Sequence, residues 1–241
     1  MPSLRQLAAP GENALLTHLP AAERDALLPL LSSVPLELRR VMQRIDEPLT
    51  HVWFPLNGVC SMVSGMENGA TVEVATVGRE GMVGIPLLLG SARSMHDTFV
   101  QVAGDALQMP AESFREQLDR LPGLRAVALR YALGLIAQIS QGSACNRLHP
   151  LEARCARWLL MTHDRVAADS FALTQEFLGQ MLGVTRPSVS VAAGMLQKAG
   201  LIRYTRGVVT ILDRDRLEAA SCECYGIITG ELIRLVRDLT G

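Results

Sequence analysis

The sequence predicts an α+β fold, with an N-terminal antiparallel β-barrel (a double-stranded β-helix), a long dimerisation helix and a C-terminal winged helix-turn-helix. Residues 34–110 carry short β-prone runs between Gly and Asn turns, and residues 111–145 are rich in helix formers. Residues 173–212 hold two short helical segments followed by a pair of strands. We therefore expect a sensor domain, a helix with a hinge, and a reader domain, over residues 1–121, 122–149 and 150–241.

The first domain is expected to open with helical residues 12–31, where Leu27, Leu28, Leu30 and Leu31 form an apolar face. The strand candidates that follow are 52-VWFPL-56, 59-VCSMVS-64, 70-ATVEVATV-77 and 98-TFVQVAG-104. The third run alternates between two sets of side chains, which is the period of a half-buried strand. Several such strands at short spacing favour an antiparallel sandwich or barrel.

The long helix has two apolar stripes. Leu124, Ala128, Tyr131 and Leu135 form one, and Leu129, Leu133 and Ile136 form the other. A helix that is apolar on two sides must bury both. One side can cover the barrel while the other faces a twin helix in a dimer, although burial of both sides within one monomer stays open. His149-Pro150 marks the hinge, because the residue before a proline is disfavoured in a helix.

After the hinge we expect a helix over residues 151–168 and a last helix over residues 215–240. The segment between them reads as a helix-turn-helix. Thr174 is placed to cap a helix over residues 175–182, and Gly183 suits the left-handed residue that ends it. Thr185 is placed to cap the next helix, with Pro187 in its first turn.

The second helix of this motif is expected to bury Val189, Ala192, Ala193 and Leu196 and to expose Arg186, Ser188 and Ser190. Two strands over residues 201–212, joined by 205-TRG-207, read as a wing whose Arg203, Tyr204 and Arg206 suit phosphate contact. The formal net charge is only −1, yet no acidic residue occurs from Phe177 to Leu212, where four basic ones do. This local charge predicts an interface with double-stranded DNA.

The motif 173-LTQEFLGQMLGVTR-186 resembles that of the Crp/Fnr superfamily of transcription regulators, and the barrel and long helix extend the resemblance over nearly the whole chain. It implies a cytoplasmic homodimer on a near-palindromic promoter site, with RNA polymerase as a further partner if the protein is an activator. By this resemblance Thr174 and Gln175 fall at phosphate contacts. The base-reading end of the recognition helix falls at Arg186, Pro187, Ser188 and Ser190, and the capping residue Thr185 is included among the residues expected to contact DNA.

The departures from the family are also informative. Many members carry a Glu at the position of Pro187 and an Arg at that of Val191, so their usual half-site is not assumed here. Members that bind cyclic AMP have a Gly-Glu pair for the ribose and an Arg for the phosphate, where this chain has Val83-Gly84 and His96. A neutral His replaces the bidentate charge of Arg poorly. We therefore expect no cyclic-AMP dependence.

Three alternatives for the effector stay open: another nucleotide, another small molecule, or no ligand at all. Arg79, Glu80, Arg93 and His96 are the residues of the barrel that could form its pocket.

The five cysteines are Cys60, Cys145, Cys155, Cys222 and Cys224. An odd, scattered set argues against a disulfide framework and for a reducing compartment. Because the first cysteine is Cys60, ligation of an iron–sulfur cluster through an N-terminal cysteine group is not expected. Cys222 and Cys224, placed on the final helix, would point to different sides, so no metal site is predicted and their role stays open.

Two other classes of protein fit the sequence less well. A cupin-type metalloenzyme needs clustered His and Glu ligands, and the five histidines show neither H-x-H nor H-E-x-x-H spacing. No P-loop, nucleophile elbow or G-x-G-x-x-G is present either, so no catalytic residue is assigned. A nucleotide-binding regulatory subunit acting through protein partners would keep the barrel but has no use for an acid-free basic reader. The sequence also shows neither a membrane span nor a secretory signal.

Overall fold

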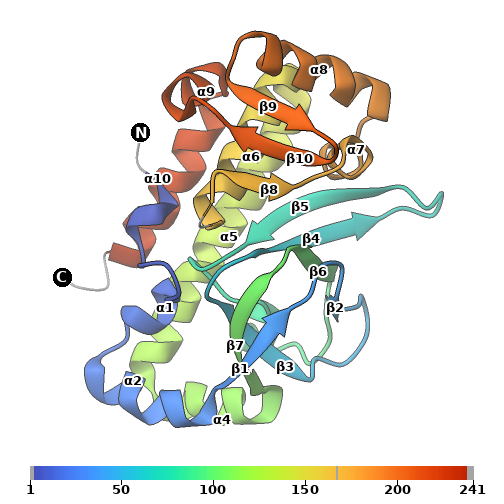
Figure 1. Cartoon of the computed structure of the whole chain (residues 1–241). Coiled ribbons are helices and arrows are strands. Elements are labelled where there is room, and N and C mark those ends of the chain that lie inside the picture. Colours follow the sequence, from blue (N-terminus) through green and yellow to red (C-terminus); the bar gives the residue numbers. More distant parts are fainter. Residues whose placement is uncertain (1–2, 167, 238–241) are drawn as a thin grey trace.

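The computed structural model describes residues 3–166 and 168–237. The chain starts with the short helices η1 (Leu4–Gln6), α1 (Ala14–Thr17), α2 (Ala21–Leu27) and η2 (Leu28–Leu30) (Figure 1). The helix predicted over residues 12–31 is therefore broken into pieces, because Pro20 and Pro29 each begin a new segment. Of its predicted apolar face, Leu27 is buried while Leu28 and Leu30 are exposed.

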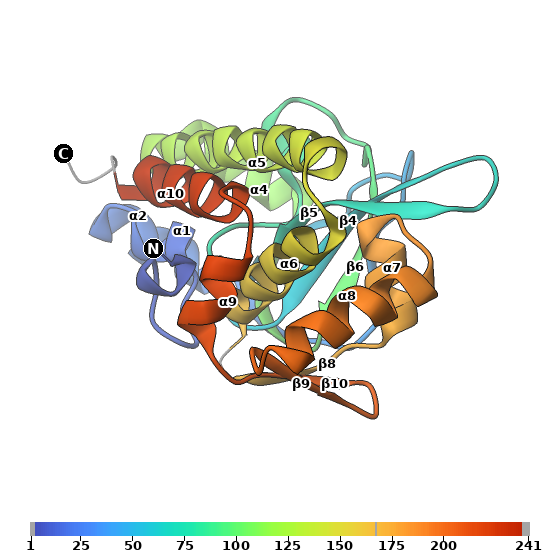
Figure 2. The same cartoon turned by 90° about the horizontal axis from the view of Figure 1, so that it is seen from above.

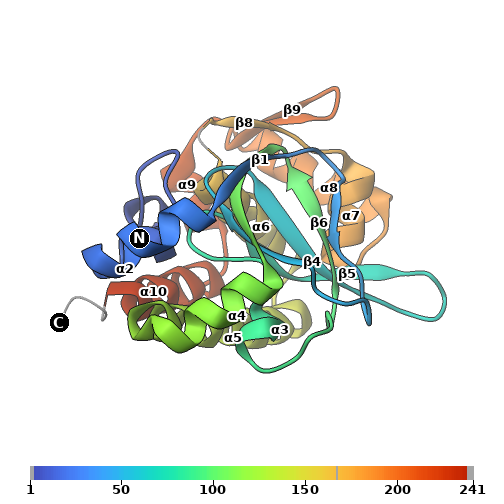
Figure 3. The ribbon, with the colours of Figure 1, turned by 90° about the horizontal axis from the view of Figure 1, so that it is seen from below.

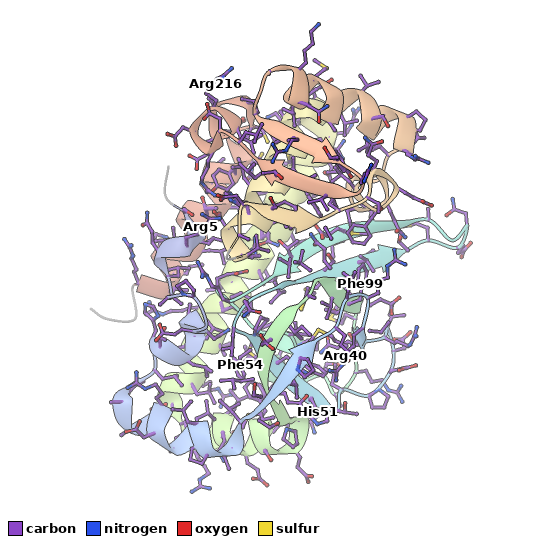
Figure 4. The ribbon with its side chains drawn as sticks, in the orientation of Figure 1. Arg5, Arg40, His51, Phe54, Phe99 and Arg216 are labelled. Carbon is purple, nitrogen blue, oxygen red and sulfur yellow. The ribbon has the colours of Figure 1, made fainter. Side chains whose placement is uncertain are left out.

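Two antiparallel sheets follow and pack face to face. One has the order β1-β7-β3, made of β1 (Ser32–Leu36), β7 (Gly104–Pro110) and β3 (His51–Pro55). The other has the order β2-β6-β4-β5, made of β2 (Val41–Gln43), β6 (Asp97–Val102), β4 (Val59–Gly65) and β5 (Thr71–Val77). Phe54 of β3, labelled in Figure 4, is buried in the common core and meets Phe114 edge-to-face, with ring centroids 6.4 Å apart. We call β1 to β7 the β-domain.

The four predicted strand runs fall on β3 to β6, but the alternation expected along β5 is not seen in its burial. Thr71 to Val74 are all half-buried, and Ala75 to Val77 are all buried. The reason is that β5 is covered by more than the β-domain core, because both α5 (Pro122–Leu148) and α7 (Gln175–Leu182) contact it.

Helix α5 packs against elements from several parts of the chain. Helices α3 (Ile85–Leu88) and α4 (Ala111–Arg120) lie beside it under the β-domain (Figure 3). Its first predicted stripe is buried throughout, and its second is exposed, with Leu129, Leu133 and Ile136 retaining 42%, 56% and 54% of their surface. An unpredicted partner is α10 (Cys224–Arg237), which runs alongside α5 (Figure 2). Gly134 permits this approach, because a Cβ there would lie 2.6 Å from Leu232.

The second half of the chain forms the winged domain. It consists of α6 (Leu151–Arg165), β8 (Ser170–Ala172), α7, α8 (Arg186–Lys198), β9 (Ile202–Thr205), β10 (Val208–Ile211) and α9 (Arg214–Ala220). Its strands have the order β8-β10-β9. Helix α6 ends at Arg165, earlier than predicted, because Val166 is extended. Of the remaining predicted residues, Ala167 lies outside the described part of the chain.

The single last helix predicted over residues 215–240 is in fact two, α9 and α10. Ser221 is extended and its hydroxyl donates to the carbonyl of Glu218, which ends α9. Cys222 therefore lies in the link between the helices and Cys224 at the first residue of α10, rather than both on one helix. Residues 238–240 of the prediction lie outside the described residues.

The winged domain is docked on the β-domain through polar and aromatic contacts. Trp158 of α6 donates its indole N–H to Glu73 of β5 at 2.7 Å. Gln180 of α7 donates to Thr71 at 2.6 Å. Phe99 of β6, labelled in Figure 4, meets Phe177 of α7 edge-to-face with ring centroids 6.0 Å apart.

Candidate nucleic-acid interface

Helices α7 and α8 are joined by a turn whose ends are capped as the sequence predicts. The hydroxyl of Thr174 accepts the amide N–H of Phe177 at 3.1 Å, and that of Thr185 accepts the N–H of Ser188 at 3.5 Å. Gly183 has φ 65° and ψ 37°, the left-handed conformation that ends α7. Gly179 must also be small, since a Cβ there would lie 2.9 Å from the carbonyl oxygen of Val184. The helix-turn-helix is therefore confirmed.

The buried and exposed faces of α8 also agree with the prediction. Val189, Ala192, Ala193 and Leu196 are buried, and the surface of α8 includes Arg186, Ser188 and Ser190.

Two further exposed side chains of α8 are apolar, Val191 at 64% and Met195 at 53%. Met195 was not singled out from the sequence, although it is an apolar residue on the polar face of the helix. Apolar side chains on a recognition helix can contact the methyl group of thymine.

The smaller polar residues at this end are held in place by one another. The hydroxyls of Thr185 and Ser188 are 3.0 Å apart, and Ser190 donates to the side-chain amide oxygen of Gln175. These contacts tie the first turn of α8 to the first turn of α7. The two helix starts therefore present their polar groups as one surface, beside the exposed Arg186.

The wing is a tight hairpin. Arg206 and Gly207 have φ of 51° and 76°, so both central residues of the turn are left-handed, as a two-residue type I′ turn requires. Arg203 and Arg206 are exposed. Tyr204, in contrast, donates its hydroxyl to the carbonyl of Leu173 at 2.7 Å, and burial raises its pKa to about 12. Its phenol holds the wing in place instead of facing outward for phosphate contact.

Of the four residues suggested for an effector pocket, His96 is the one that lines the small cavity of the β-domain. A cavity of about 20 Å³ inside the β-domain is lined by residues that include Val83, Gly84 and His96. Burial lowers the pKa of His96, whose Nδ1 is 3.4 Å from the hydroxyl of Ser64. Arg93 donates to the carbonyl of Asp46. Neither Arg79 nor Glu80 lines this cavity, and both are buried elsewhere.

A larger cavity, of about 240 Å³, lies where β5, α5, α6 and α7 meet. Its lining includes Glu73, Gln138, Arg157 and Trp158. Burial raises the pKa of Glu73 to about 7, despite hydrogen bonds from Ser61 and Trp158 that lower it. This cavity could not be predicted from the sequence, because its walls come from separate elements.

Within residues 3–166 and 168–237, no helix has the length and apolar character required to cross a bilayer.

Comparisons with known proteins place both halves of the chain. Residues 153–220 match the family described as a Crp-like helix-turn-helix domain, and residues 36–120 match the cyclic nucleotide-binding domain family. A search of curated proteins gave no significant sequence match.

Solved structures share the fold at low identity. FixK2 from Bradyrhizobium japonicum aligns with a TM-score of 0.68 at 16% identity, covering 80% of this chain and 98% of its own. The c-di-GMP responsive global regulator CLP of Xanthomonas campestris gives 0.62 at 13%, covering 80% and 99%. A transcriptional regulator of the CRP family from Thermus thermophilus gives 0.61 at 20%, covering 78% and 96%.

Proposed function

The chain belongs to the Crp/Fnr superfamily of transcription regulators, and we propose that it binds a near-palindromic promoter site as a homodimer, reading bases with the N-terminal end of α8. The observation that carries this proposal is the exposed surface formed by Arg186 and the starts of α7 and α8. A recognition helix of this kind enters the major groove by its N-terminal residues. Arg203 and Arg206 on the wing supply positive charge beside the groove for phosphate contact.

The dimer is supported by the exposed stripe of α5. Leu129, Leu133 and Ile136 recur at the spacing of one helix face, and a monomer would leave all three in water. A second copy of α5 packed against this stripe as a coiled coil would bury them. Two-fold symmetry then sets two recognition helices on two half-sites, roughly 34–36 Å apart as in other dimeric helix-turn-helix proteins.

Cyclic-AMP independence is supported by the cavity of the β-domain. Its volume of about 20 Å³ is far below the roughly 300–1,000 Å³ of ordinary ligand pockets. A small-molecule effector, if there is one, has more room in the larger cavity at Glu73.

The family consists of regulators and not enzymes. We expect the protein to be located in the cytoplasm. If it is an activator, we also expect it to contact RNA polymerase.

The alternative is a nucleotide-binding regulatory subunit that acts on protein partners. It does not explain why the face of α8 is exposed and free of acidic residues.

Selection of bound sequences from random double-stranded DNA, followed by electrophoretic mobility shift on the selected site, tests the proposal. We expect an inverted repeat bound by a dimer. The Arg186→Ala variant should fold and yet lose its preference for a particular base at one position of each half-site. Selection that enriches no sequence, with equally weak binding to every duplex, would contradict the proposal and favour the regulatory-subunit alternative.

A further inference from the structure

Four side chains with metal-binding atoms meet at the hinge between α5 and α6. They are Cys145 and His149 at the end of α5, Cys222 in the link before α10, and Cys224 at the first residue of α10. Their ligand atoms all lie within 4.8 Å of one another. The two segments are more than seventy residues apart in the sequence, so the fold brings the set together. None of the four belongs to the proposed DNA interface.

Two pairs of donor atoms are spaced nearly as they are around a single tetrahedral ion, and all four donor atoms lie within 4.8 Å of one another. The sulfurs of Cys145 and Cys222 are 3.4 Å apart, and the sulfur of Cys224 is 3.5 Å from Nδ1 of His149. With Zn–S near 2.3 Å and Zn–N near 2.0 Å, donors around a tetrahedral zinc ion are about 3.5–3.8 Å apart. A four-iron cluster needs its ligands further apart, because each binds a different iron.

The cluster is shielded from solvent as a structural metal site is. All three cysteines are buried, and they form a small core of their own with Ala153 packed against it. His149 is half-buried, which leaves a route by which an ion can enter. Each of the three thiols would release a proton on binding, so affinity would rise with pH.

The surroundings orient and balance the donors. The ring of His149 presents Nδ1 to Cys224, while its Nε2 is 3.2 Å from the carboxylate of Glu223. A carboxylate on the second nitrogen of a ligating histidine is the usual support for such a ligand. Gln141 donates to the sulfur of Cys224 at 3.1 Å.

We propose that these four residues bind one Zn²⁺ ion and that the ion clamps the hinge. It would join the last turn of α5 to the start of α10, directly beside the His149-Pro150 junction from which the winged domain begins. The position of the winged domain relative to α5 then depends on the metal. Because two of its ligands are the C-x-C pair, the set depends on the break between α9 and α10, which leaves Cys222 in the link and Cys224 at the first residue of α10.

The test uses the full chain, purified without chelator from cells grown with zinc. We expect one zinc per chain by elemental analysis and, after exchange with Co²⁺, the intense visible bands of tetrahedral cobalt together with thiolate charge transfer. Cys222→Ser and Cys224→Ser should lose the metal and these bands. Cys155→Ser, which removes a buried cysteine outside the cluster, should keep both. If protein purified from cells grown with zinc contains no zinc, or contains a Cys145–Cys222 disulfide instead, the proposal is overturned.

A further variant is needed because a cysteine variant that misfolds would also lose its zinc. Glu223→Gln keeps all four ligands and should weaken zinc binding about 10- to 100-fold, as changes behind a ligating histidine do. Stripping zinc from the wild-type chain should make the His149-Pro150 hinge more sensitive to protease, and re-adding Zn²⁺ should reverse this. If Glu223→Gln binds zinc as tightly as the wild-type chain, or if protease cleaves the hinge equally with and without zinc, the proposal that zinc clamps the hinge is wrong.

Discussion

Arg165 and Glu80 form an ion pair that is sealed from solvent, with Nη2 of the arginine 2.7 Å from the carboxylate and the two side chains 0% and 1% exposed. Arg165 ends α6, and Glu80 follows β5, so the pair joins the winged domain to the β-domain. The guanidinium also donates to the carbonyl of Met161 at 2.7 Å. Gly78 makes room for it, because a Cβ there would lie 2.6 Å from the arginine side chain.

Removing one partner of this pair should destabilise the fold strongly. We expect Glu80→Ala to lower the free energy of unfolding by about 3–5 kcal/mol, because it leaves a buried charge uncompensated. Replacing both, as Glu80→Met with Arg165→Met, should recover part of that loss. Urea titration measures both changes. Asp119→Ala, which removes the exposed pair with Arg125, is the control and should cost at most about 1 kcal/mol. A double variant less stable than Glu80→Ala would refute the expectation.

Charging the exposed stripe of α5 should separate the proposed dimer. We expect Leu133→Glu with Ile136→Glu to give monomers in light scattering and to abolish specific DNA binding, because two carboxylates cannot be buried between twin helices. Ile227→Glu places the same charge on an exposed apolar position of α10 and should leave the mass unchanged. Dimers of normal mass from the double variant would show that α5 is not the contact.

The arginines of the winged domain should divide into base and phosphate contacts. Arg186→Ala should cost roughly 1–3 kcal/mol on the selected site and relax preference at one position of each half-site. Arg203→Ala and Arg206→Ala should weaken all duplexes alike and lower the salt slope by about one unit per contact. Binding series on single-base variants at several salt concentrations measure this. If Arg186→Ala keeps the wild-type ranking of sequences, the arginine does not read a base.

Cyclic AMP should neither bind tightly nor alter DNA binding. The cavity at His96 is too small for a nucleotide, and the neutral imidazole does not supply the charge that a phosphate requires. Titration calorimetry should give no binding heat, and the mobility shift should be the same with and without the nucleotide. A dissociation constant in the micromolar range would reject this prediction.

Glu73 should make stability depend on pH. Burial raises its pKa from 4.5 to about 7, so in that window the folded chain holds a proton that the unfolded chain releases. Its contribution to stability is present below pH 4.5 and is lost as pH rises to about 7.

The stability of Glu73→Gln relative to wild type should therefore increase between pH 5 and 8, as measured by melting temperature. Glu67→Gln, at an exposed position of the β4–β5 turn, should show no such trend. A constant difference between Glu73→Gln and wild type would contradict the assignment.

Local signals made the helix-turn-helix predictable. The residues that cap the two helices bond to backbone groups close to them in the chain, so their roles can be predicted from the sequence. They are Thr174, Gly183 and Thr185. The Glu80–Arg165 pair and the cysteine cluster were not predictable, because each joins segments that only the fold brings together. Cys222 and Cys224 were misplaced for a related reason. The break between α9 and α10 contains no proline or glycine to mark it.

The packing of α10 on α5 has a consequence for the order in which the chain becomes complete on the ribosome. Helix α5 leaves the exit tunnel long before α10 is synthesised, and until then its Gly134 side has no cover. A nascent or truncated chain that ends before residue 224 therefore displays apolar surface on both sides of α5. Such a chain would leave in water the side of α5 that α10 covers in the folded protein, so α10 is needed to complete the core around α5.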